Sequence, residues 1–379
     1  MGFGMSSYFS RLRSVALAVI ALACASASLA QQYVYTNDNI ASANSTTVLS
    51  VDTTGSLKAL HTYSTGGKGS GDGSDYGSQP IAATQTPTNW CLFVSNAGSS
   101  NIAAFRINLN NGTLTTVSGS PFADGASGEQ MSGISLAVGG SKLLFAANSE
   151  SDSISVMEVS SNCKLSLVDK VNLSYAPVGL KVTPNGNFLI ASYLGPVDSF
   201  QIDYTNNTIT ELGPFPSKGA PAGVDVRCGS TRVFFGDANA NTQVEVFAID
   251  SNGQLSEVSD FTYPDGSNSN NVLLSADQKK LYVTNNQSNQ ITVLSVSTSG
   301  NLTFDSITTL NKPGAFSLGL ATNKGGNLLF VSEVNNPEKI GVLAASGKSL
   351  QEVPNSPFRV INNDRAFGGV VFVPPYSCP

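Results

Sequence analysis

A short run of apolar and aromatic residues that ends in a polar residue recurs along the chain. Its copies include Leu-Phe-Val-Ser-Asn at residues 92–96 and Leu-Tyr-Val-Thr-Asn at residues 281–285. The seven copies end at Asn37, Asn96, Asn148, Tyr193, Asp237, Asn285 and Glu333, with 44 to 59 residues from one to the next. Repeats of about 40 to 50 residues are typical of β-propeller blades.

Each copy has similar surroundings. A strand pattern with a tight turn, such as Pro-Asn-Gly at residues 184–186, precedes it, and alternating apolar and polar residues, as at 291–296, follow it. A second turn, as in Gly253-Gln254-Leu255, leads into a fourth short strand. This period-2 alternation predicts strands, and no stretch shows sustained helical periodicity. We therefore expect an all-β chain that folds as a seven-bladed β-propeller of four-stranded blades.

The two ends of the repeat array complement each other. The first copy, residues 33–37, has no strand pattern ahead of it after the N-terminal segment, and residues 367–373 form a leading strand with no copy behind it. Placed side by side, they complete a seventh blade and leave no open sheet edge. A linear solenoid, the alternative, would keep the two segments apart.

The first thirty residues have a different character. Arg11 and Arg13 precede a mostly apolar run at residues 14–23, and small residues at Ser28 and Ala30 suit a cleavage site. This layout predicts a secretory signal peptide over residues 1–30 and a propeller over residues 31–379. We expect export to the periplasm or the extracellular space. Lipidation at Cys24 is the alternative.

Composition narrows the possible partners. Only 12% of the residues are charged, and the formal net charge is −6. An acidic chain without a basic run is a poor candidate for binding nucleic acid or an anionic membrane, and no later segment is apolar enough to span a bilayer. No phosphate-binding loop, zinc motif or redox pair of cysteines occurs, so we expect no cofactor and no metal. We expect a monomer whose partner is a small-molecule ligand or an envelope protein.

Four cysteines remain after the predicted cleavage. They are Cys91, Cys163, Cys228 and Cys378. In an exported chain they could form two disulfides in three pairings, or remain as buried thiols. Because Cys91 comes just before an inner strand and Cys378 follows the closing strand, we favour a Cys91–Cys378 bond.

The repeat with its Pro-Asn-Gly turn and Leu-Tyr-Val-Thr-Asn core resembles the Tyr-Val-Thr-Asn repeat propellers. More narrowly, residues 33–373 resemble the seven-bladed lactonase family related to 6-phosphogluconolactonase. The resemblance implies lactone chemistry in a central cleft, performed by arginine, histidine and glutamate side chains. Arg365-Ala366-Phe367 matches the Arg-x-Phe part of one family motif, and Glu333 matches the glutamate of another. The family's Gly-Pro-Arg-His sequence is replaced by Gly-Ala-Phe-Ser at residues 314–317, and the one histidine, His61, lies elsewhere.

Glu333 and Arg365 are the candidate catalytic pair. A carboxylate at Glu333 could activate water for attack on a lactone carbonyl. The Arg365 guanidinium could stabilise the oxyanion or hold an anionic substrate group. A local ion pair without catalytic function is the alternative.

The residues that end the seven runs should line one mouth of the channel. Candidate substrate-binding residues there are Asn37, Asn96, Asn148, Tyr193, Asp237 and Asn285, with Arg359 in support. Three interpretations stay open: turn capping by short polar side chains, hydrogen bonding to a sugar-like ligand, and an oxygen-ligand cation site. His61 opens a predicted Gly/Ser/Asp-rich loop that extends to Pro80.

Two functions follow from these observations. The first is an exported, lactonase-like carboxylic ester hydrolase that acts on a sugar-derived or other small lactone at the channel mouth. The second is a non-catalytic propeller of the cell envelope that binds a ligand or a protein. The residues alone leave open whether the protein is an enzyme.

Overall fold

A computed structural model describes residues 1, 32–71, 79–126, 133–238, 243–264, 268–311, 316–334, 339–360, 369–376 and 378. Apart from Met1, the predicted signal peptide lies outside these residues, and so does Arg365. Residues 31–379 form one compact unit. Within the described part of the chain, no helix has the length and apolar character needed to cross a membrane.

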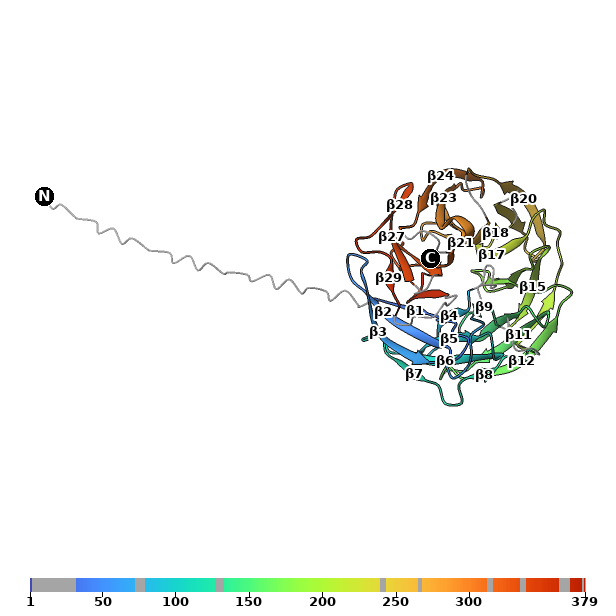
Figure 1. The fold of residues 1–379 in the computed structure, drawn as a ribbon. Helices are drawn as coiled ribbons and strands as arrows, with labels where there is room; N and C mark the ends of the chain where they lie inside the picture. Colours follow the sequence, from blue (N-terminus) through green and yellow to red (C-terminus); the bar gives the residue numbers. More distant parts are fainter. Residues whose placement is uncertain are drawn as a thin grey trace. The chain divides into compact units, whose positions relative to one another are not determined.

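Seven antiparallel sheets stand around a central axis (Figure 1). Each sheet is one blade, and the strands of a blade are named from the innermost to the outermost. Blade 1 contains β30 (Val370–Val373), β1 (Gln32–Thr36), β2 (Ser45–Val51) and β3 (Leu57–Ser64). Blade 2 contains β4 (Ile81–Gln85), β5 (Trp90–Asn96), β6 (Asn101–Ile107) and β7 (Leu114–Thr116), with β8 (Phe122–Ala123) also paired to β6.

The remaining blades follow in chain order. Blade 3 contains β9 (Ser135–Gly139), β10 (Leu143–Asn148), β11 (Ser153–Val159) and β12 (Leu165–Asn172). Blade 4 contains β13 (Gly179–Val182), β14 (Phe188–Ser192), β15 (Val197–Asp203) and β16 (Thr208–Glu211). Blade 5 contains β17 (Pro221–Val226), β18 (Arg232–Asp237), β19 (Val244–Ile249) and β20 (Leu255–Phe261).

Blades 6 and 7 complete the ring. Blade 6 contains β21 (Ser269–Leu274), β22 (Lys280–Asn285), β23 (Gln290–Val296) and β24 (Leu302–Thr309), with a short 3-10 turn, η1, at Asn286–Ser288. Blade 7 contains β25 (Phe316–Thr322), β26 (Leu328–Val334), β27 (Lys339–Ser346) and β28 (Ser349–Glu352), with β29 (Phe358–Arg359) also paired to β27. The predicted seven-bladed fold is confirmed.

The ring closes between the two ends of the chain. β1 pairs antiparallel with β30, from Tyr33 opposite Val373 to Thr36 opposite Val370. The predicted closing strand begins at residue 367, whereas β30 begins at Val370, and residues 361–368 lie outside the described residues. The C-terminal strand is thus the innermost strand of the blade that the N-terminal strands build.

The hydrophobic core lies between neighbouring blades. Alternating strand positions point apolar side chains at the next sheet, as expected of period-2 patterning. Between blades 7 and 1, Phe330 of β26 stacks on Phe372 of β30 with ring centroids 5.6 Å apart. Between blades 4 and 5, Ile190 packs with Val224 and Phe235 in one buried cluster. Each blade therefore needs its neighbours to bury its faces, which is why the repeat forms a closed ring.

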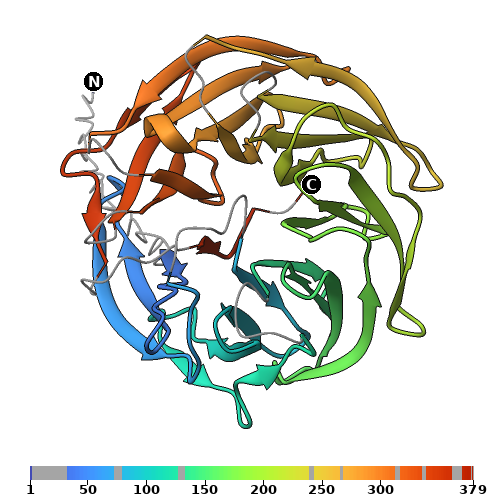
Figure 2. The same cartoon turned by 45° about the vertical axis from the view of Figure 1, so that its right-hand side comes forward.

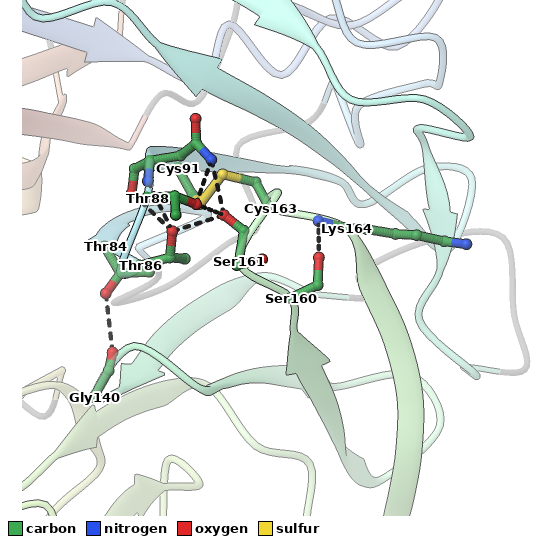
Figure 3. The surroundings of a disulfide bond; sticks show 10 residues. Thr84, Thr86, Thr88, Cys91, Gly140, Ser160, Ser161, Cys163 and Lys164 are labelled. Atoms are coloured by element: carbon green, nitrogen blue, oxygen red, sulfur yellow. Dashed lines mark hydrogen bonds between the residues drawn. A yellow bond between two sulfur atoms is a disulfide. The ribbon is translucent and has the colours of Figure 1, made fainter.

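The disulfide pairing differs from the one we favoured from sequence. Cys91 is bonded to Cys163 and Cys228 to Cys378. Cys163 lies in the turn between β11 and β12 of blade 3, and this turn packs against the start of β5 in blade 2. Figure 3 shows the contact, where the side chains of Thr86 and Thr88 donate hydrogen bonds to the Ser161 carbonyl. Cys91 is therefore already paired across neighbouring blades.

The last residues cross one end of the channel. After β30 the chain runs through Pro374, Pro375 and Tyr376 to Cys378, which is bonded to Cys228 in the turn between β17 and β18 of blade 5. In Figure 2 the chain continues from β30, in dark red inside the ring, toward blade 5, where Cys378 is bonded to Cys228. We call residues 374–376 and 378 the C-terminal strap. This course carries Cys378 away from Cys91, which explains why the favoured pairing was wrong.

His61 also lies elsewhere than predicted. It belongs to β3 and pairs with Val48 of β2, so the loop starts only after Ser64. The backbone of residue 69 in that loop donates to the Ile40 carbonyl, and that of Lys68 donates to Ser99 Oγ. The described part of this loop is therefore bonded to blades 1 and 2.

Candidate functional site

The channel has two chemically different ends. The second strand of each blade finishes at one end, which we call the mouth end. In blades 2 to 7 the first and second strands are joined by tight turns at the other end, which we call the turn end. The seven predicted ring residues belong to the mouth end, and the strap belongs to the turn end.

All seven ring residues occupy equivalent positions and are buried. Asn37, Asn96, Asn148, Asp237, Asn285 and Glu333 are 0% exposed, and Tyr193 is 7% exposed. Each one lies at the end of the second strand of its blade or within one residue of it. A contact of these residues with a substrate stays a prediction.

The asparagines of the ring hold their blades together. The Asn37 amide donates to the carbonyls of Pro80 and Ser95, at 3.1 and 3.0 Å. The Asn285 amide donates to Thr292 Oγ1 at 2.8 Å, while its oxygen accepts from the Tyr263 hydroxyl at 2.6 Å. Buried polar groups need such partners, and these bonds favour the turn-capping interpretation for the amides.

A second position, on the third strand, completes the pattern. In blades 3 to 7 it is the residue that pairs with the strand position two before the ring residue: Ser155, Asp198, Glu245, Thr292 and Gly341. In blades 3, 4 and 6 the ring residue bonds to it directly, from Asn148 to Ser155, from Tyr193 to Asp198 and from Asn285 to Thr292. We call each such couple a mouth pair.

Blade 5 has a mouth pair made of two acids. Asp237 and Glu245 are both 0% exposed. Glu245 Oε1 accepts from the backbone N–H groups of Lys218 and Gly219, at 3.1 and 2.6 Å, and Asp237 Oδ1 accepts from that of Ala220 at 2.7 Å. Burial, and then the neighbouring charge of Asp237, raise the pKa of Glu245 to about 7.

Blade 4 has a tyrosine and an acid. The Tyr193 hydroxyl donates to Asp198 Oδ2 at 3.2 Å, and Asp198 Oδ1 accepts from the backbone of Ser199 and of the residue at 213, at 2.7 and 3.0 Å. Burial, and then a hydrogen bond with the Glu211 carboxyl group, raise the pKa of Asp198 to about 7. Two neighbouring blades therefore place acids that titrate near neutral pH at the mouth end.

In blade 7 the mouth pair lacks a second side chain. A Cβ atom on residue 341 would lie 2.4 Å from Glu333 Oε1. The Glu333 carboxylate therefore occupies the space that the third-strand side chain fills in blades 3 to 6. Arg365, its predicted catalytic partner, lies outside the described residues.

Arg359 lies farther out in the same blade. Glu333 is in register with Lys339, and Lys339 with Arg359. Two strand spacings, about 10 Å, separate the backbones of Glu333 and Arg359, and Arg359 is exposed. The Arg359 side chain also interacts with another group of the protein.

The turn end contains a cavity of about 690 Å³. Residues of the first strands, most of them apolar, line much of it, and Pro375, Tyr376 and Cys378 of the strap border it. Its charged group is an ion pair, in which Lys181 Nζ lies 2.8 Å from Asp225 Oδ1. Asp225 also accepts from the backbone of Val226 and Leu274, at 3.0 and 2.8 Å. A volume of this size is typical of small-molecule pockets.

Sequence reasoning missed three residues at the mouth end: Asp198, Glu245 and Tyr175, whose ring stacks on Tyr193. An acid in an alternating strand pattern, as in Gln-Val-Glu-Val-Phe at residues 243–247, was a usable signal, because the same position is apolar or hydroxylic in blades 1, 2, 3 and 6. Within the described ranges, no group of three or more His, Cys, Asp or Glu residues could hold a metal ion.

Comparison with known proteins agrees with this architecture. Residues 230–348 match the family model described as "Lactonase, 7-bladed beta-propeller". No curated protein sequence matches the chain.

Solved structures extend the likeness to the whole ring. A periplasmic gluconolactonase of Pseudomonas aeruginosa is 20% identical, with a TM-score of 0.70 over 92% of this chain and 100% of the other. A candidate 6-phosphogluconolactonase of Bacteroides fragilis is 17% identical, with a TM-score of 0.71 over 90% and 98%. At these identities the structural likeness shows the fold alone. The predicted resemblance is confirmed, and the chain is a seven-bladed β-propeller that carries a match to the lactonase propeller family in residues 230–348.

Proposed function

We propose that this protein is an exported lactonase that opens a sugar-derived or other small lactone at the mouth end of its channel. The observation that carries the proposal is the mouth pair of blade 7. There a fully buried carboxylate, Glu333, stands at the ring position with only Gly341 opposite it. A carboxylate held in this way is suited to accept a proton from water.

The proposed reaction adds one water to the lactone. Glu333 takes a proton from the water as the water oxygen attacks the carbonyl carbon, and Arg365 stabilises the oxyanion that forms. The ring C–O bond then breaks, the departing alkoxide receives the proton, and a hydroxy acid is released. No cofactor enters this scheme.

Two disulfides support the exported location. Disulfides persist in oxidising compartments and are rare in the cytosol, and this chain has them at Cys91–Cys163 and Cys228–Cys378. The P. aeruginosa structure of the same fold is that of a protein named as periplasmic. The proposed export includes cleavage after Ala30, so the mature protein should begin at Gln31. Mass determination of the mature protein tests this cleavage.

A panel of lactones tests the activity. Mature protein with both disulfides formed is assayed for acid release from glucono-δ-lactone, galactono-γ-lactone and γ-butyrolactone. We expect Glu333→Gln and Arg365→Ala each to lower kcat/KM by a factor of about 10² to 10⁴, the usual range for one acid–base group. Glu352→Gln, on the outermost strand of the same blade, and Arg106→Ala, on β6, are the matched controls and should keep wild-type rates. Turnover that survives both Glu333→Gln and Arg365→Ala would refute the assigned roles.

The hydrogen bonds of the ring asparagines favour a second candidate, a binding propeller without catalysis. The side-chain amides of Asn37, Asn148 and Asn285 have hydrogen-bond partners within the protein. This is the arrangement expected of residues with a structural role. Absence of turnover on every lactone of the panel, with the protein folded and oxidised, would favour this candidate over the lactonase.

A further inference from the structure

Blade 4 departs from the other blades at the ring position. Six blades have asparagine, aspartate or glutamate there, and blade 4 has Tyr193. The ring of Tyr193 stacks on that of Tyr175, with centroids 5.8 Å apart and an angle of 30° between the planes. This aromatic pair is a feature that the repeat does not require.

Asp198 anchors the pair through the hydroxyl group of Tyr193. Tyr193 is 7% exposed, and its hydroxyl bonds to Asp198, which is itself 0% exposed and accepts two backbone N–H bonds. A buried carboxyl group is costly unless it is hydrogen-bonded, and here it is bonded to the backbone and to the Tyr193 hydroxyl. Burial and this hydrogen bond hold Tyr193 in place without a ligand.

The other ring of the pair, that of Tyr175, is partly exposed to solvent. Tyr175 is 45% exposed and Leu194, beside Tyr193 in sequence, is 40% exposed. Tyr175 lies in the segment between β12 and β13, and Leu194 lies between β14 and β15. Both connections, one from the fourth strand to the next blade and one from the second strand to the third, belong to the mouth end.

Blade 4 stands almost opposite blade 7 in the ring, because two blades separate them in one direction and three in the other. A single small lactone that is bound at Glu333 would not extend to Tyr175. Whatever Tyr175 contacts is thus a separate ligand or a distant part of a longer one.

We propose that Tyr175, supported by Tyr193 and Asp198, is a binding platform for a neutral pyranose sugar, separate from the lactone site in blade 7. A pyranose has an apolar face of C–H groups with hydroxyls around its edge, and the electron-rich face of an aromatic ring binds such a surface. The platform is flat, half-exposed and pre-oriented, and the carboxyl group that anchors it, Asp198, is buried. These properties suit a neutral sugar rather than a charged ligand.

The chain contains a matched control. Tyr263 and Phe304 form another stacked pair, with centroids 6.5 Å apart and an angle of 18° between planes, and Phe304 is 37% exposed. Phe304 lies on β24, the outermost strand of blade 6. It has the exposure and the stacking of Tyr175 but lies on the rim of the ring.

Saturation-transfer NMR with methyl β-D-glucopyranoside and with cellobiose, neither of which is a lactone, tests the platform. We expect transfer to the sugar C–H protons in the wild type, a loss of about tenfold or more in Tyr175→Ala, and little change in Tyr175→Phe or Phe304→Ala. Glu333→Gln should bind as the wild type does. Near-ultraviolet circular dichroism confirms that each variant is folded.

The outcomes separate this proposal from the lactonase proposal. Absence of transfer in the wild type, or equal transfer in Tyr175→Ala and Phe304→Ala, overturns the platform whatever the lactone assay gives. Transfer that depends on Tyr175 in a protein without lactone turnover supports the platform and counts against the lactonase.

Discussion

The two ends of the channel bury charge in opposite ways. At the mouth end Glu245 lies beside Asp237, and Asp198 beside Glu211, so that like charges are neighbours and the pKa values of Glu245 and Asp198 rise to about 7. At the turn end the buried Asp225 faces Lys181 at 2.8 Å. The mouth end therefore holds two buried acids whose pKa is raised to about 7, whereas the turn end has an opposite-charge pair and a covalent strap.

This difference shows where the repeat allows specialisation. The fold constrains the strands and turns of every blade, but the mouth pair varies in chemistry among blades 3 to 7. It is an amide with a hydroxyl in two blades, a tyrosine with an acid in one, two acids in one, and an acid with a glycine in one. Blades can change their chemistry at this position without changing their hydrogen-bonded ladder. We expect functional differences among related propellers to concentrate in the same pairs.

The largest effect should come from opening the strap. The Cys228–Cys378 bond spans 150 residues and the Cys91–Cys163 bond spans 72. In the loop-entropy model these bonds contribute about 5 and about 4 kcal/mol to the free energy of unfolding. Cys228→Ser/Cys378→Ser should therefore lower stability at least as much as Cys91→Ser/Cys163→Ser, as measured by urea unfolding.

The strap variant also separates the two ends. Lys181 borders the cavity that the strap helps to enclose, so acylation of Lys181 by an amine-reactive reagent should become faster in Cys228→Ser/Cys378→Ser. The Cys91→Ser/Cys163→Ser variant is the control and should show the wild-type rate. Equal acylation rates in all three proteins would contradict the assignment of the strap as a closure of the turn end.

The next effect concerns the space opposite Glu333. Gly341→Ala would place a Cβ atom 2.4 Å from Glu333 Oε1, so the carboxylate must move. Overpacking of this kind costs about 1 to 3 kcal/mol, measurable by urea unfolding, and should lower lactone turnover as well. In Glu333→Ala/Gly341→Ala the clash is absent, and the alanine at position 341 should cost much less. A cost that is the same in both backgrounds would show that the carboxylate does not occupy that space.

The fold was predictable because its signal is local and repeated. Each of the seven copies of the repeat predicts the same strand order. The two complementary segments at the chain ends predict how the ring closes. The positions of the ring residues followed from the strand ends. Their partners did not, because a partner such as Glu245 is identified only when the register of β18 against β19 is known.

The disulfides and the aromatic platform needed information from beyond one blade. Cys163 reaches Cys91 because a turn of blade 3 packs on blade 2, and Cys378 reaches Cys228 because the chain crosses the channel after β30. Tyr175 belongs to a connection between blades, where the repeat pattern gives no position. Contacts between blades therefore set the limit of what this sequence predicted.

A smaller effect follows from the acids of the mouth end. Glu245 has a pKa of about 7 in the folded protein, above its ordinary value of 4.5. Between these values the folded state binds more protons than the unfolded state, so the contribution of Glu245 to stability is present below about pH 4.5 and is lost as the pH rises to 7. Glu245→Gln removes this loss. Relative to wild type, the variant should gain on the order of 1–2 kcal/mol in unfolding free energy between pH 5 and pH 8, allowing for solvent screening.

The equivalent positions in other blades provide the controls for this pH effect. Asp198→Asn in blade 4 should show the same sign, because Asp198 also has a raised pKa. Thr292→Val in blade 6 removes a hydroxyl and should cost about the same at both pH values. If Glu245→Gln and Thr292→Val have parallel pH profiles in urea unfolding, the acid pair of blade 5 does not titrate as we infer.

The smallest effect compares one tyrosine hydroxyl at each end. Tyr193 donates to Asp198 at the mouth end, and Tyr204 donates to the carbonyl of residue 186 at the turn end, at 3.2 and 3.0 Å. Each Tyr→Phe change should cost about 1 kcal/mol. Hydrogen bonds to an ionised group are about twice as strong as neutral ones, so the cost of Tyr193→Phe should increase from pH 5 to pH 8 as Asp198 ionises. The cost of Tyr204→Phe should stay constant, because its acceptor does not titrate. Urea unfolding at the two pH values measures both, and equal pH profiles would remove the electrostatic contrast between the ends of the channel.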